Sequence, residues 1–262
     1  MPIPRRRGCR AALLALLALL PAVAGAGSAQ YHVPPSLDAL PADKFGGLVR
    51  LGYAIVSDTP KYAGRYVGNG LSCRNCHLDY GQKPNAAPFW AAWGVYPSWR
   101  AKNNRVNSFE LRVQECFRYA LNGTPPAPAA LELQAISAYA YWLAQGVPVG
   151  QELPGRGFPV IPKTGQDPSP DRGKQVYGRA CASCHGTAGE GRDAVPPVWG
   201  LRSFNKGAGM HNVQTAAGFI KANMPLGAPA LADQDALDVA AYINAQVRPA
   251  DPRKGWLGFF EP

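Results

Sequence analysis

Two copies of the motif C-x-x-C-H, at residues 73–77 and 181–185, are the clearest chemical feature of this 262-residue chain. In this motif two thiols add to the vinyl groups of haem, and the adjacent histidine reaches the iron from the same helical turn. The sequence therefore predicts two covalently bound haem c groups. Their attachment residues would be Cys73 and Cys76 for the first haem and Cys181 and Cys184 for the second, with His77 and His185 as the proximal iron ligands.

Two other uses of paired cysteines fit the pattern poorly. A redox-active C-x-x-C gives no reason for a histidine directly after both pairs. A four-cysteine zinc site usually has its two pairs about 15–20 residues apart, whereas here more than a hundred residues separate them. Haem attachment is the interpretation that accounts for all six residues.

Each iron then needs a ligand opposite its histidine, or an open position. For the second haem the strongest candidate is Met224, which lies 39 residues after His185. A thioether opposite histidine suits electron transfer and raises the reduction potential. Met210 and His211 are competing candidates, and a methionine is often only a core side chain.

The first haem has no methionine in its half of the chain, but Cys116 lies 39 residues after His77. A thiolate opposite histidine would push electron density onto the iron and lower its potential. The alternative is that Cys116 is a buried free cysteine that acts as a small hydrophobe. His32 is a weak candidate, because a ligand so close to the expected N-terminus would be poorly held.

A predicted helix over residues 108–122 positions Cys116, with Ser108 as its N-cap and Gly123 as its stop. Positions three and four apart share a helix face, so Arg112 would lie one turn from Cys116 over the same pocket. A neighbouring apolar stripe should pack into the core; it consists of Phe109, Val113, Phe117 and Leu121.

The two halves of the chain follow one plan, which indicates duplication of a small unit. Each has a helix candidate, the haem motif, a Gly- and Pro-rich loop and a closing amphipathic helix, and Tyr141–Pro148 parallels Tyr242–Pro249. A Pro- and Gly-rich segment, 147–170, reads as the linker. Domains over 30–155 and 156–262 follow, mostly α, without a convincing run of alternating strands.

Caps define two helices of the second half. Ser169-Pro170 provides an N-cap and first helical position for a helix that runs into Cys181. Asp233 can cap the final helix, which should stop before Pro249.

Residues 1–29 have the features of a secretory signal peptide: four arginines, an Ala/Leu run and small-residue cleavage sites. Its removal would take away Cys9 and those four arginines, lowering the formal net charge from +10 to +6. The apolar run is too short to span a bilayer comfortably, and no other stretch is long enough. We therefore expect a periplasmic protein without a membrane span after cleavage.

Basic residues gather near Cys116. The stretch from Trp99 to Arg118 contains only two acidic residues, Glu110 and Glu115. Its basic residues are Arg100, Lys102, Arg105, Arg112 and Arg118. Such a cluster favours small anions, although a solvated face or pairing with haem propionates would also account for it. Nucleic acid is excluded as a partner, because the expected compartment is wrong and no binding motif is present.

Three segments resemble the thiosulfate dehydrogenases that form tetrathionate. Gly68–Leu78 is similar to that family's first haem site, Glu110–Gly123 to the helix that carries its cysteine ligand, and Phe219–Gly227 to its methionine-ligated segment. The resemblance covers nearly the whole chain after residue 29 and implies two class I cytochrome c-like domains in tandem.

The resemblance also implies an activity. Two thiosulfates would couple to tetrathionate at the haem held by His77 and Cys116, with Arg105 and Arg112 holding the substrate. Electrons would pass through the second haem to an acceptor cytochrome or another periplasmic redox protein. One departure is Ala120, where the family commonly has serine. The alternatives are an electron carrier without catalysis, and the haem subunit of a multiprotein sulfur-oxidising complex.

Overall fold

The computed structural model describes Met1 and residues 30–253, so residues 2–29 of the predicted signal peptide lie outside this part. Residues from Tyr31 onward form one compact unit. We call residues 31–155 the first half and residues 156–253 the second half. None of the described helices has the length and apolar character needed to cross a membrane.

The predicted mostly helical class is confirmed. In the first half the elements are η1 (Leu37–Ala39), α1 (Lys44–Ser57), α2 (Thr59–Ala63), η2 (Gly64–Tyr66), η3 (Cys73–Asn75), α3 (Leu78–Gly81), α4 (Phe89–Trp93), β1 (Ser98–Arg100), β2 (Arg105–Asn107), α5 (Phe109–Tyr119) and α6 (Leu131–Leu143). The second half contains α7 (Pro170–Ala180), α8 (Ala182–His185), η4 (Gly209–His211), α9 (Val213–Asn223) and α10 (Asp233–Ala245).

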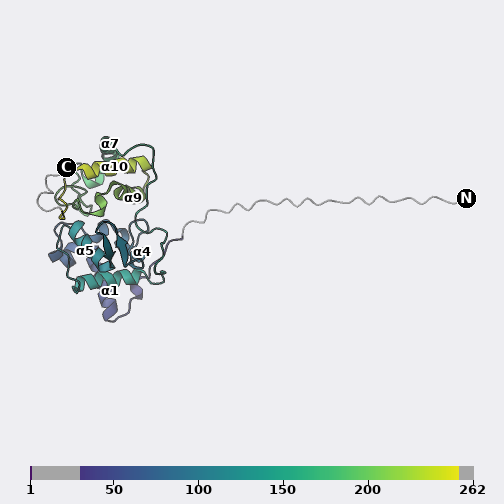
Figure 1. Cartoon of the computed structure of the whole chain (residues 1–262), viewed down its shortest axis with the longest axis vertical. Coiled ribbons are helices and arrows are strands. Elements are labelled where there is room, and N and C mark those ends of the chain that lie inside the picture. The colour runs from purple at the N-terminus through teal and green to yellow at the C-terminus, as the bar shows by residue number, and fades with distance from the viewer. Residues whose placement is uncertain (2–29, 254–262) are drawn as a thin grey trace. The chain divides into compact units, whose positions relative to one another are not determined.

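Each half is built on a crossing of its first and last long helices, and Figure 1 shows α7 beside α10. Glycines allow the close approach. A Cβ on Gly52 of α1 would lie 2.1 Å from the Ala135 carbonyl oxygen of α6, and one on Gly173 of α7 would lie 2.0 Å from that of Asp238 in α10. Contacts shorter than van der Waals distance exclude any larger residue.

The glycine contacts also correct the predicted correspondence between residues of the two closing helices, α6 and α10. Gly52 faces the Cβ of Tyr139, and Gly173 faces that of Tyr242. Tyr139, not Tyr141, is therefore the counterpart of Tyr242 in this packing. Tyr141 is 44% exposed, because it lies two positions further along the helix and faces away from the crossing.

Local signals in the sequence place several helix ends. Ser108 and Ser169 cap α5 and α7 as predicted, each accepting a backbone N–H three residues on. Helix α5 ends three residues before Asn122, which takes a left-handed conformation. The N-cap of α10 is Ala232, so the prediction of Asp233 as the cap was wrong by one position. The Asp233 carboxylate instead pairs with Lys221.

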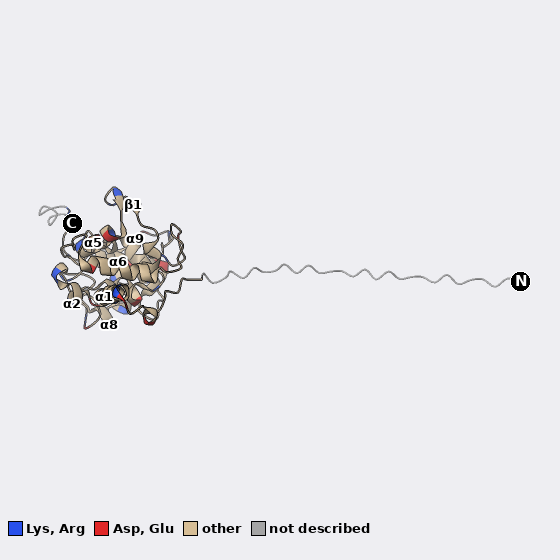
Figure 2. Cartoon of the chain, turned by 90° about the horizontal axis from the view of Figure 1, so that it is seen from below, with Lys and Arg blue, Asp and Glu red and all other residues tan. Residues whose placement is uncertain are grey.

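The strands β1 and β2 were not predicted. They form an antiparallel hairpin with Trp99 opposite Val106, both exposed. Figure 2 shows the hairpin projecting from the rest of the unit, with the ribbon blue, for a basic residue, near its end. Three-residue strands are too short for alternation to be visible in a sequence.

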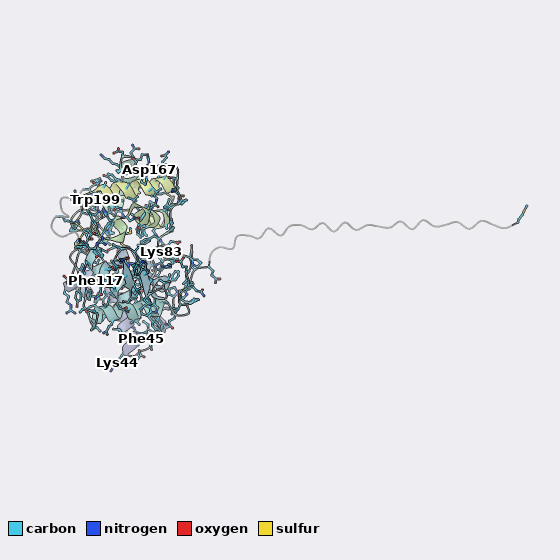
Figure 3. The ribbon with its side chains drawn as sticks, in the orientation of Figure 1. Lys44, Phe45, Lys83, Phe117, Asp167 and Trp199 are labelled. Carbon is cyan, nitrogen blue, oxygen red and sulfur yellow. The ribbon has the colours of Figure 1, made fainter. Side chains whose placement is uncertain are left out.

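Buried residues form two clusters, one centred in each half. The first contains the predicted stripe on α5, where Phe109, Phe117 and Leu121 are buried and Val113 packs against them. It also receives Phe204 and Ala208 from the second half. Figure 3 marks Phe117 in the first half and Trp199, which packs against the other cluster. The two halves therefore share part of their core.

Candidate functional site

A cavity of about 370 Å³, which we call the first cavity, contains the first C-x-x-C-H motif. Its lining includes Cys73, Cys76 and His77 of the motif. Arg112 and Cys116 of α5 also line it. Most of the remaining lining is apolar. The sequence motif and the candidate ligand 39 residues later therefore meet in one hollow space.

Backbone carbonyls fix both motif histidines in the same way. The Nδ1 of His77 donates to the carbonyl of Ala87 at 2.7 Å, and that of His185 donates to Pro196 at 3.0 Å. Such a bond sets the tautomer and the ring orientation, and leaves Nε2 as the nitrogen available to a metal. This arrangement is the one expected of proximal haem ligands.

Cys116 faces His77 closely enough for a hydrogen bond between their side chains. Burial raises the pKa of the Cys116 thiol, but the guanidinium of Arg112 and the contact with His77 outweigh burial and lower it to about 7. The side chain is therefore readily present as a thiolate, the form that binds metals. Ser108 supports this geometry by capping α5, and the buried Phe117 anchors the helix beside Cys116.

The motif thiols have the opposite character. Burial raises the pKa of Cys73 to about 11, that of Cys76 to about 12 and that of Cys181 to about 11. No cysteine in the described residues forms a disulfide. Free thiols, an imidazole Nε2 that no backbone group occupies and a largely apolar cavity fit covalently attached haem.

Positive side chains border the first cavity. Arg112 lines it while its Nη1 lies 3.4 Å from Glu115 Oε2, and Arg100 and Lys102 line it from the hairpin. Burial, Arg253 and Arg112 together lower the pKa of Lys102. Arg105 is exposed on β2 and does not contribute to the lining. Its role in holding substrate stays a prediction, and Arg100 and Lys102 are better placed.

The second half supplies one wall of the first cavity, which the sequence did not reveal. Phe204, Ala208 and Met210 contribute to the lining. Asn205 anchors this segment by donating to the Arg118 carbonyl at 3.0 Å, and Lys102 donates to the carbonyl of Gly207. Residues 203–210, which we call the wall segment, therefore belong to the first site although they follow the second haem motif.

The candidates for the second distal ligand lie in different surroundings. Met224 directly follows α9 and packs against the second cluster. Asn223 before it is buried and donates to the carbonyl of Asn85 at 3.0 Å. Met210 contacts both clusters and lines the first cavity, and His211 is partly buried. The assignment of Met224 stays a prediction.

The ring of His32 makes structural contacts and is not free. Its Nε2 lies 2.9 Å from the Leu143 carbonyl oxygen, and its ring lies 5.4 Å from that of Trp90. These contacts tie the start of the compact unit to the end of α6. Ala120, by contrast, lines the first cavity, so the departure noted in the sequence falls at the site itself.

Two family models match the chain. Residues 62–149 match the SoxA/TsdA cytochrome c domain, and residues 168–243 match the cytochrome c oxidase, cbb3-type, subunit III domain. The ranges contain one C-x-x-C-H motif each. Both are cytochrome c domains, and such domains imply covalently bound haem c.

Similar proteins align with most of the length of this chain. A thiosulfate dehydrogenase of Stutzerimonas stutzeri (strain A1501) is 52% identical, over 87% of this chain and 76% of that protein. One from Thiomonas intermedia (strain K12) is 47% identical, over 90% and 76%. The solved thiosulfate dehydrogenase (TsdBA) of Marichromatium purpuratum is 45% identical with a TM-score of 0.83, over 86% of this chain. The chain spans about half (51%) of that longer solved chain.

Proposed function

The chain belongs to the thiosulfate dehydrogenase family, and on that premise we propose that it couples two thiosulfates to one tetrathionate in the first cavity. Membership makes it an oxidoreductase, a thiosulfate-oxidising cytochrome with covalently bound haem c. The observation that carries the finer proposal is the pairing of Cys116 with His77 across one cavity, with Arg112 beside the thiol.

The reaction balances without a proton. Two thiosulfate dianions form one bond between their outer sulfur atoms and release two electrons, and the product is the tetrathionate dianion. Haem c, when bound at His77, supplies the electron-accepting chemistry. The protein must gather negative charge, and Arg100, Lys102 and Arg112 offset the charge of the substrates where they meet.

The residue opposite His77 determines the reduction potential of this site. The Cys116 thiolate is the proposed ligand opposite His77, and it would lower the potential there relative to a methionine ligand. A second haem at Cys181 and Cys184 would then have the higher potential. Electrons would pass from the first site to the second, and then to an external periplasmic acceptor.

The shared core supports this order. The wall segment belongs to the second half, yet Phe204 and Met210 line the first cavity. Met210 also packs against the second cluster, as Cys181 does. The two haem sites are therefore joined through packed side chains within one compact unit, which favours transfer inside the chain.

A direct assay tests the proposal. Purified protein, with two haems verified by mass, would be mixed with thiosulfate and ferricyanide. We expect two ferricyanide ions to be reduced for each tetrathionate detected by ion chromatography. No tetrathionate would overturn the proposal in favour of an electron carrier. Turnover that requires a carrier protein would indicate a subunit of a multiprotein complex.

Replacement of Arg112 by glutamine should raise the KM for thiosulfate by about 10-fold or more, because a charge-assisted hydrogen bond to the dianion is lost. Arg112→Lys should recover part of the loss. The matched control is Arg118→Gln on the exposed face of α5, for which KM should stay near the wild-type value. Equal KM values for both glutamine variants would rule out Arg112 as a substrate contact.

A further inference from the structure

Arg248 is a buried cation without an acidic partner among the described residues. It follows α10 and is only 4% exposed. Its Nη2 donates to the carbonyl of Ile243 at 2.7 Å and to that of Val198 at 3.3 Å. Its Nε and Nη1 are buried and have no hydrogen-bond partner in the structure. The guanidinium therefore has unused donors inside the protein.

The surroundings of Arg248 do not compensate for its charge. The guanidinium carbon lies 4.1 Å from the centre of the Phe204 ring, which stabilises a cation only partly. Burial lowers the pKa of Arg248 to about 10, and no carboxylate in the described part of the chain counteracts this effect. Because an unpaired buried charge is strongly destabilising, the site calls for an anion that the described residues do not supply.

A second unused donor lies nearby. His211 is partly buried, and its Nδ1 has no hydrogen-bond partner. Burial lowers the pKa of His211, and the nearby charges of Arg248 and Lys206 lower it further, whereas a contact with Asn244 and the charge of Asp251 offset these effects only in part. His211 is therefore favoured in its neutral form, which has one N–H to donate. A guanidinium and an imidazole with free donors together suit a carboxylate.

The connections of Arg248 point to the second haem site. The carbonyl of Val198, which Arg248 contacts, lies two residues after that of Pro196, which holds His185. Trp199, marked in Figure 3, continues this loop and packs against the second cluster. Haem bound at Cys181 and Cys184 would supply two propionate groups, which are the kind of anion that the described residues beside Arg248 do not provide.

We propose that the Arg248 guanidinium binds a propionate of the haem attached at Cys181 and Cys184, with His211 Nδ1 as a second donor. This inference rests on the second haem of the proposed function and not on the substrate. A positive charge held beside the propionate offsets its negative charge, which raises the reduction potential of that haem. Arg248 would thereby favour electron flow toward the second haem.

Redox titration of the holoprotein without thiosulfate tests the assignment. In Arg248→Gln the potential of the second haem should fall while that of the first stays unchanged; electron paramagnetic resonance distinguishes the two by their distal ligands. Arg248→Lys should give a smaller fall, since the charge remains. Lys174→Gln, which removes an exposed cation of α7, should leave both potentials unchanged.

A second measurement covers the case in which Arg248→Gln does not accumulate. Resonance Raman spectra of wild type and Arg248→Lys should differ in the haem propionate bending mode. Unchanged potentials and an unchanged bending mode would overturn the proposal, as would a shift confined to the first haem or a second motif without haem. Since no substrate is present, failure here is distinct from failure to form tetrathionate.

Discussion

Replacement of Cys116 by serine should lower the rate of thiosulfate oxidation by at least about 100-fold, the scale of loss seen when a group that directly supports the reacting centre is removed. Serine has nearly the same size, so α5 and its packing should persist. A hydroxyl does not ionise near neutral pH, whereas Arg112 and His77 lower the pKa of the Cys116 thiol to about 7. The variant therefore lacks the thiolate while keeping the shape of the site.

The same variant should raise the reduction potential of the first haem, because an electron-donating thiolate is lost. The measurements are the ferricyanide-coupled rate and a redox titration of each haem. Cys116→Met is the informative companion, since it offers the ligand proposed for the second haem. If both variants match wild type in rate and potential, Cys116 is not a ligand.

Replacement of Gly173 by alanine should destabilise the protein by about 3 kcal/mol or more, the upper range for overpacking. The added Cβ would lie 2.0 Å from the Asp238 carbonyl oxygen and 2.8 Å from the Tyr242 Cβ, so α7 and α10 would have to separate. Backbone atoms of a helix cannot move aside as the tip of a side chain can. The expected result is a lower denaturation midpoint by circular dichroism.

Gly178→Ala is the matched control for this change. Gly178 lies on the same helix, and no heavy atom comes within 4 Å of the Cβ it would gain. Alanine there should stabilise α7 by about 0.5–1 kcal/mol through helix propensity. If both variants shift the midpoint equally, the close crossing of α7 and α10 is not a constraint on stability.

Part of the site could be predicted from the sequence, because it depends on residues that lie close together in the chain. The haem motif needs adjacent residues on one turn, so spacing alone identified His77, and the spacing of Cys116 within the Ser108-capped helix placed it beside Arg112. The structure brings these residues into one cavity. The predicted N-caps, where side-chain oxygens can reach backbone N–H groups, were accurate to about one position. The predicted end of the Cys116 helix at Asn122 was three residues too late.

Contacts between segments that lie far apart in the sequence could not be predicted in this way. In the sequence, Arg105 and Lys102 are equivalent members of a basic stretch. Only the fold of the hairpin brings Lys102 to the lining of the first cavity and leaves Arg105 outside it. Arg248 has no motif around it. Its significance comes from the carbonyls and the ring that surround it, which belong to residues about 5, 44 and 50 positions away.

The wall segment has a consequence for how such a chain can evolve. A duplicated domain is ordinarily free to be lost, exchanged or moved to another gene. Here Phe204 and Ala208 of the second repeat are part of the core of the first, and Asn205 bonds to the Arg118 carbonyl. Separation of the two halves would open the first cavity and expose the apolar side chains of the wall segment. We therefore expect neither half to be lost or exchanged without the other.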